Sequence, residues 1–162
     1  MMKKYFFIVI LLIPLISWAD ILIPMDLTQT DHLKAYGCAY WTLTQKQNVK
    51  WLLNYRGGSF LTEDNADVER ICRLRGVRYE TVSAVDVMQI QEQIEQQNME
   101  IVLLEKVPKI AVYTPGDKRP WDDAVTLALT YAEIPFDKVY DDEIMEGKLQ
   151  EYDWLHLHHE DF

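Results

Sequence analysis

The residues most able to do chemistry lie close together near the C-terminus. Tyr152 to His158 has the pattern of a buried strand, and His158, His159 and Glu160 stand at its carboxyl end. Histidine changes its charge near neutral pH, and a neighbouring carboxylate can orient it as a general base. Open α/β folds place ligands and catalytic groups at the carboxyl ends of their strands. We therefore predict His158, His159 and Glu160 as the candidate catalytic residues.

The same segment has two other interpretations. In an extended strand His156 and His158 point to the same side, away from Leu155 and Leu157, and such a pair can chelate a metal. The plainer alternative is one buried, hydrogen-bonded histidine followed by a polar exit from the sheet. A His-x-His-His run does not decide between these interpretations, and no cofactor is expected.

A sheet must position these residues, and the last third of the chain has the pattern of one. Three short strands, the first of them continuously apolar, alternate with two helices, over Lys109–Thr114, Trp121–Ile134, Phe136–Tyr140, Asp142–Leu149 and Tyr152–His158. This alternation predicts a βαβαβ unit over residues 108–162. The expected fold class is α/β, a three-layer parallel sheet with an amidotransferase-like or flavodoxin-like start. Such a unit normally continues for two more strands. We therefore expect it to be incomplete and the chain truncated, unless the first half supplies the missing strands.

The loop after the first of these strands offers a weaker site. Gly116, Lys118 and Arg119 precede a predicted helix N-terminus, which favours anions. Three aspartates between positions 117 and 123 oppose a phosphate there, and the chain has no glycine-rich phosphate motif. Anion binding at this loop is therefore disfavoured.

Residues 20–107 are predicted to form a smaller mixed α/β region with a β-hairpin. The expected elements are helices over Thr28–Tyr36, Asp64–Arg75 and Asp86–Gln97, and strands over Cys38–Leu43, Val49–Tyr55, Val77–Val82 and Ile101–Leu104. The first two strands are joined by a polar turn, which predicts the hairpin and places Trp41 beside Trp51. Arg56, before two glycines, is either part of a turn or a group that binds a carboxylate.

The N-terminus has the layout of a secretory signal peptide over residues 1–19. Lys3 and Lys4 precede an apolar run from Tyr5 to Ile16, and Ser17-Trp18-Ala19 ends in small residues suited to cleavage. The alternative is an uncleaved membrane anchor, but the run is shorter than the ~20 residues that a spanning helix needs. We expect export to the periplasm or cell envelope, with no stable membrane span after cleavage.

Composition limits the partners and the role of the cysteines. A net charge of −10 argues against nucleic acid, whose phosphates favour a basic surface. The chain has two cysteines, Cys38 and Cys72, too few and too far apart for a zinc site. In an oxidising compartment they either form a disulfide or remain two buried thiols.

Four segments of the chain resemble a known family. Tyr40-Trp41, Trp51–Phe60, Lys109–Thr114 and Asp153–Phe162 resemble the start of exported Bacteroidetes proteins labelled asparagine synthetase B. The resemblance implies that residues 108–162 begin a domain similar to class I glutamine amidotransferases. It also implies that a catalytic cysteine would follow a later strand, beyond Phe162.

Three functions remain open at this stage. The first is a non-catalytic binding module for an unknown small molecule or envelope partner. The second is a hydrolase or glutamine amidotransferase whose nucleophile is encoded beyond Phe162. The third is the asparagine synthetase of the family label. That enzyme uses an N-terminal cysteine and a Ser-Gly-Gly-x-Asp-Ser loop, whereas the mature chain here would begin at Asp20 and contains no such loop.

Overall fold

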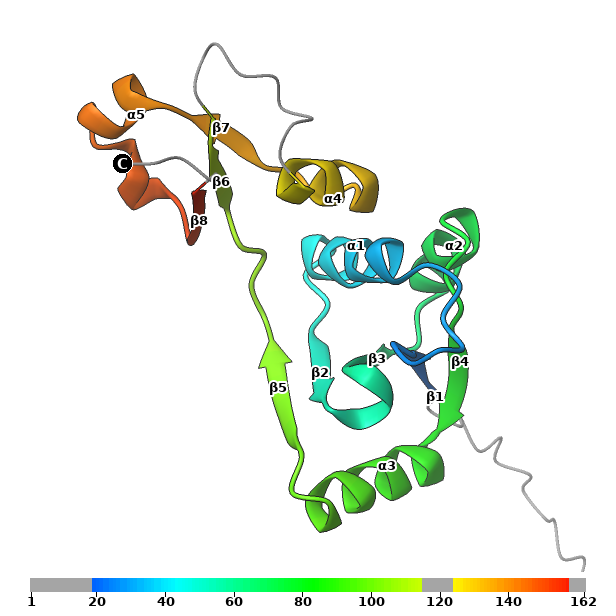
Figure 1. Cartoon of the computed structure of the whole chain (residues 1–162). Coiled ribbons are helices and arrows are strands. Elements are labelled where there is room, and N and C mark those ends of the chain that lie inside the picture. The colour runs from blue at the N-terminus through cyan, green and yellow to red at the C-terminus, as the bar shows by residue number, and fades with distance from the viewer. Residues whose placement is uncertain (1–18, 115–123, 158–162) are drawn as a thin grey trace, which may run out of the picture.

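The computed structural model of the chain describes residues 19–114 and 124–157 (Figure 1). These residues form a mixed α/β fold with two sheets, one antiparallel and one parallel. The predicted α/β character is therefore confirmed. None of the described helices is long and apolar enough to cross a membrane.

The first half of the chain forms the antiparallel sheet. Its strands are β1 (Ala19–Ile23), β2 (Val49–Leu53), β3 (Ser59–Glu63), β4 (Glu80–Ser83) and β5 (Glu100–Leu104). Its helices are α1 (His32–Thr44), α2 (Ala66–Leu74) and α3 (Ala84–Gln96). The described strands lie in the order β4-β1-β3-β2-β5. The path β1-α1-β2-β3-α2-β4 through the first four is the βαββαβ connectivity of ferredoxin-like folds, and α3 and β5 extend it.

The strands of this sheet alternate their side chains between two cores. Ile21, Ile23 and Phe60 pack on the face that α1 and α2 cover. Leu22 and Leu61 pack on the opposite face, in one buried cluster with Ile90 and Ile94 of α3. Figure 1 shows α1 and α2 on one side of the sheet and α3 on the other. The period of two along each strand thus places a buried layer on both faces.

The predicted strand at Cys38–Leu43 is wrong, because these residues belong to α1. Asp31 caps the helix by accepting a hydrogen bond from the Lys34 backbone N–H at 2.9 Å. Small and apolar residues then face the core at helical spacing, namely Ala35, Cys38, Ala39 and Leu43. This core-facing stripe extends the helix through the segment that was expected to be extended.

The hairpin forms between β2 and β3, and not between Cys38–Leu43 and Val49–Tyr55 as predicted. β2 pairs with β3, so Trp51 lies opposite Phe60 rather than beside Trp41. The turn between them contains the short 3-10 helix η1 (Tyr55–Gly57). Gly57 has φ +80°, and a Cβ atom on it would lie 2.3 Å from the Met25 carbonyl oxygen. Glycine is therefore required at this position of the turn.

The other predicted elements of the first half are confirmed with shifted ends. The helix expected over Asp64–Arg75 is α2, which Asn65 caps. The helix expected from Asp86 begins at Ala84, because Ser83 and Asp86 form a capping box. The strands expected over Val77–Val82 and Ile101–Leu104 are β4 and β5.

The second half forms the predicted parallel βαβαβ unit. Its described elements are β6 (Ile110–Tyr113), α4 (Ala124–Ala132), β7 (Asp137–Val139), α5 (Asp141–Met145), the 3-10 helix η3 (Lys148–Glu151) and β8 (Trp154–Leu157). Both strand pairs are parallel, and the order is β7-β6-β8. Among the described residues the first half adds no strand to this sheet, so the expectation that it might supply the missing strands is wrong.

The two sheets are connected through helix packing. Figure 1 shows α4 lying against α1, and a Cβ atom on Gly37 of α1 would lie only 1.9 Å from the Ala132 carbonyl oxygen of α4. Glu133, just after α4, accepts hydrogen bonds from Lys34 and Arg75, each at 2.7 Å. Close backbone contact and these ion pairs hold the parallel unit against α1 and α2.

Candidate functional site

The carboxyl edge of the parallel sheet is the first candidate site. From the central strand β6 the chain goes to β7 on one side and later to β8 on the other. The direction of winding therefore reverses between β6 and β8, and open α/β sheets bind ligands at such a reversal. Thr114 follows β6, Tyr140 and Asp141 follow β7, and Leu157 ends β8.

Two tyrosines and two carboxylates organise this edge. The Tyr113 hydroxyl donates a hydrogen bond to Asp141 Oδ1 at 2.9 Å, and the rings of Tyr113 and Tyr140 lie 5.5 Å apart. The Tyr140 backbone N–H donates to Glu143 Oε2 at 2.9 Å. This hydrogen bond holds the pKa of Glu143 below its usual value. The hydrogen bond from Tyr113 to Asp141 fixes the start of α5 to the end of β6.

Thr114 has an unusual environment at the same edge. Its backbone N–H donates to the Val139 carbonyl at 2.9 Å, which extends the pairing of β6 with β7. Its hydroxyl oxygen is buried and has no hydrogen-bond partner within the part of the chain that the structure describes. Buried polar groups are nearly always paired, which makes this hydroxyl a candidate contact for a bound molecule.

His156 lies on the other side of the sheet from the Tyr113–Asp141 pair. It pairs with Val112 of β6 and shares the face that packs against α4, whereas Leu157 pairs with Tyr113. Its ring lies 6.5 Å from the Trp154 ring in an edge contact. The structure therefore places His156 at the face of the sheet rather than with the polar groups of the edge.

The remaining predicted site residues lie outside the described part of the chain. These are His158, His159 and Glu160, together with Gly116, Lys118 and Arg119 of the loop after β6. Their predicted roles in catalysis, and that of the pair His156 and His158 in metal binding, stay predictions. Residues 19–114 and 124–157 contain no group of three side chains that could hold a metal ion.

The sequence reasoning missed Tyr113, Thr114 and Asp141. A polar residue directly after a buried strand is the available signal, and it applies to Thr114 and to Asp141, which follows β7 by two positions. The hydrogen bond between Tyr113 and Asp141 depends on the pairing of Tyr113 with Val139, which no local pattern reveals.

An apolar recess of about 410 Å³ lies between the two halves of the chain. It is lined by α1, the β5–β6 connection, α4 and β8, and its walls include Tyr36, Leu129 and Trp154. The Tyr40 hydroxyl at its rim donates to the Pro108 carbonyl at 3.3 Å. Burial raises the pKa of Tyr40. The recess offers few polar groups to orient a ligand.

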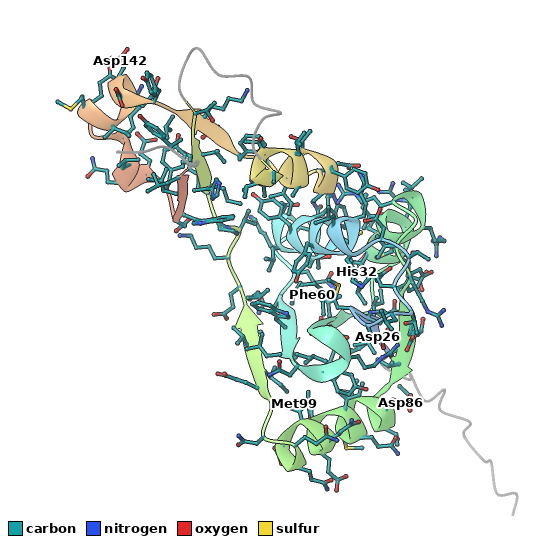
Figure 2. All side chains as sticks on the ribbon, viewed as in Figure 1. Asp26, His32, Phe60, Asp86, Met99 and Asp142 are labelled. Atoms are coloured by element: carbon teal, nitrogen blue, oxygen red, sulfur yellow. The ribbon has the colours of Figure 1, made fainter. Side chains whose placement is uncertain are left out.

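Arg56 does bind carboxylates, and both belong to this chain. Its guanidinium donates to Asp26 Oδ2 at 2.7 Å and to the two Glu80 oxygens at 2.8 and 3.1 Å. These hydrogen bonds lower the pKa of Asp26 and of Glu80. Figure 2 shows Asp26 near His32, in the connection between β1 and α1. Arg56 therefore ties this connection to β4 and the β2–β3 turn, and its role is structural.

No family model, curated protein or solved structure matches the chain. It is a mixed α/β protein in which a ferredoxin-like antiparallel sheet carries a three-stranded parallel unit, with a polar candidate site at the strand ends of that unit.

Proposed function

We propose that the chain is an exported periplasmic or envelope protein with an amidotransferase-like α/β module that binds a small molecule without catalysis. One observation carries this proposal. The carboxyl edge has the Tyr113–Asp141 hydrogen bond and a buried Thr114 hydroxyl that has no hydrogen-bond partner among the described residues. The segments after its strands, residues 114–123, 140–153 and 158–162, contain no cysteine or serine. These segments thus offer binding groups but neither a serine nor a cysteine nucleophile.

The predicted leader supports export. The predicted cleavage site, after Ala19, lies between the first and second residues of β1. Cleavage after Ala19 leaves Asp20 as the first residue, still paired with Glu63 of β3 and Val82 of β4. The antiparallel sheet therefore retains nearly all of β1 after removal of the leader.

The charge at the edge indicates the class of ligand. Three acidic residues, Asp141, Asp142 and Glu143, form the first turn of α5, and Figure 2 shows Asp142 at the end of the molecule farthest from α3. These negative charges repel an anion and attract a cation at short range. We infer a small ligand that carries an amino group and accepts a hydrogen bond from Thr114.

Thr114→Val is expected to change ligand affinity and stability in opposite directions. Valine has nearly the same shape and removes a buried hydroxyl without a described partner, so we expect the free energy of unfolding to rise by about 1 kcal/mol. Ligand affinity should fall about tenfold, since one hydrogen bond is lost. Binding is measured by calorimetry with glutamine, arginine and spermidine, and stability by urea unfolding.

The matched control is Asp142→Asn, which removes a charge from the same turn of α5 but no hydrogen bond to Tyr113. It should weaken binding much less than Asp141→Asn. Binding that survives in both Thr114→Val and Asp141→Asn would place the ligand elsewhere. Tighter binding of inorganic phosphate than of the three amines would contradict the proposed ligand class.

The alternative is a hydrolase or glutamine amidotransferase, including the asparagine synthetase of the family label. The order β7-β6-β8 with parallel strands favours it, because such a unit can begin an amidotransferase-like sheet. Under our proposal the purified chain releases no ammonia from glutamine above the heat-denatured control. Release that is lost in His158→Ala would establish the hydrolase instead.

A further inference from the structure

The two cysteines, distant in the sequence, meet in the core of the first half. Cys38 is on α1 and Cys72 is on α2, and both are completely buried in the same apolar cluster. Each thiol shifts the pKa of the other, so the two side chains lie close together. Both helices lie on the same face of the antiparallel sheet (Figure 1). The sulfur atoms are thus already adjacent before any bond forms between them.

A positive charge lies beside this pair. Arg75 directly follows α2, and a Cβ atom on Gly37 of α1 would lie 3.1 Å from its Nη1 atom. Its Nη2 donates to Glu133 at 2.7 Å, whereas its buried Nε and Nη1 have no hydrogen-bond partner among the described residues. The guanidinium is therefore held against α1, next to Cys38.

This arrangement makes the two thiols chemically unequal. The hydrogen bond from the Cys72 thiol, followed by the charge of Arg75, lowers the pKa of Cys38. The hydrogen bond with Cys38 and burial raise the pKa of Cys72. A thiolate is the form that attacks a disulfide, so Cys38 is the nucleophile of the pair.

We propose that Cys38 and Cys72 form a disulfide that ties α1 to α2 as the chain folds in an oxidising compartment. The proposal rests on the export proposed above, since such bonds persist in oxidising compartments. It is testable on the purified chain without reference to export.

The reaction is two successive thiol–disulfide exchanges with a small external disulfide. In the partly folded chain, the Cys72 thiol loses its proton and attacks the external disulfide, which releases one thiol that takes up this proton and leaves a mixed disulfide on Cys72. When α1 packs against α2, the Cys38 thiolate attacks the Cys72 sulfur, and the second external thiol leaves with the proton of Cys38. Two protein thiols are oxidised and one external disulfide is reduced.

The bond would strengthen the attachment of α2 to α1. Val68 and Cys72 are the buried residues of α2, so few side chains anchor this helix. A covalent tie closes the segment 39–71 into a loop and restricts the unfolded chain. We expect the Tm of the oxidised chain to exceed that of the reduced chain by about 10 °C.

The test is refolding of the full chain with a mixture of reduced and oxidised glutathione. The product is denatured, treated with maleimide and weighed by mass spectrometry. We expect no maleimide addition and a mass lower by two hydrogen atoms, with two additions after dithiothreitol. The Cys38→Ala/Cys72→Ala chain should have the same Tm with and without reductant. Two reactive thiols in refolded wild type would overturn the proposal.

Arg75→Met tests the role assigned to the positive charge. This variant should accumulate the mixed disulfide with glutathione during refolding, because the Cys38 thiolate is less favoured. Lys34→Met is the matched control, since it removes the other cation bound to Glu133 and leaves Arg75 in place. If the disulfide forms in vitro but protein recovered from cells has free thiols, the pairing is supported and the proposed export is contradicted.

Discussion

Gly37→Ala is expected to lower the free energy of unfolding by about 2 kcal/mol, although alanine is the better helix former. The added Cβ atom would lie 1.9 Å from the Ala132 carbonyl oxygen and 3.0 Å from its carbon. This obstacle is backbone, so α4 must move away from α1. The gain in helix propensity, about 1 kcal/mol, does not offset the loss of this packing. Urea unfolding followed by circular dichroism measures the change.

Gly76→Ala is the control for this substitution. Gly76 has φ +68°, and no heavy atom lies within 4 Å of the position of its added Cβ. It therefore tests backbone strain without a clash, and we expect a loss of about 1 kcal/mol. If Gly37→Ala instead stabilises the chain, as helix propensity alone predicts, the close contact of α1 with α4 is wrong.

Arg56→Met is expected to lower the free energy of unfolding by about 3 kcal/mol at pH 7. The guanidinium is bound to Asp26 and to both oxygens of Glu80, and these three side chains are only 26%, 29% and 31% exposed. Its removal leaves two partly buried carboxylates close together without a counter-charge. The matched control, Arg70→Met, breaks an exposed pair with Asp67 and should cost less than about 0.5 kcal/mol.

The pH dependence of stability tests the same cluster. The pKa values of Asp26 and Glu80 lie below their ordinary values of 3.8 and 4.5 in the folded chain. Their contribution to stability is therefore present above these ordinary values and is lost as the pH falls toward the lower folded values. Wild type should lose stability on acidification below about pH 5, and Arg56→Met should lose less. Equal acid-side slopes in the two proteins would show that Arg56 does not lower these pKa values.

The parallel unit could be predicted because its signals are local. The central strand β6 is a short apolar run, β8 is mostly apolar, and the intervening helices have their own periodicity, so alternation alone predicted βαβαβ. The first half was harder, since Cys38–Leu43 suits either a strand or a buried helix. Its assignment depends on the Asp31 cap and on Gly37, which lies in the helix interior and contacts α4. Such a contact joins residues nearly a hundred positions apart in the chain, and no local pattern reveals it.

The candidate site also combines features that local sequence patterns predict with features that they do not. Alternation along β8 correctly separated His156 from Leu155 and Leu157, because the strand period is local. It did not reveal that the His156 face packs against α4, nor that Tyr113 reaches Asp141. These features depend on the order and register of three strands. The assignment of Arg56 had the same limit, since its partners come from β4 and the connection after β1.

The most direct test of the proposed binding function is an amide NMR titration of the folded, isotope-labelled chain with glutamine, arginine and spermidine. Our account predicts saturable shifts at the carboxyl edge of the parallel sheet, centred on Thr114 and Asp141, for at least one of these amines. No shift with any of them, or shifts confined to the walls of the apolar recess around Tyr36 and Leu104, would contradict it.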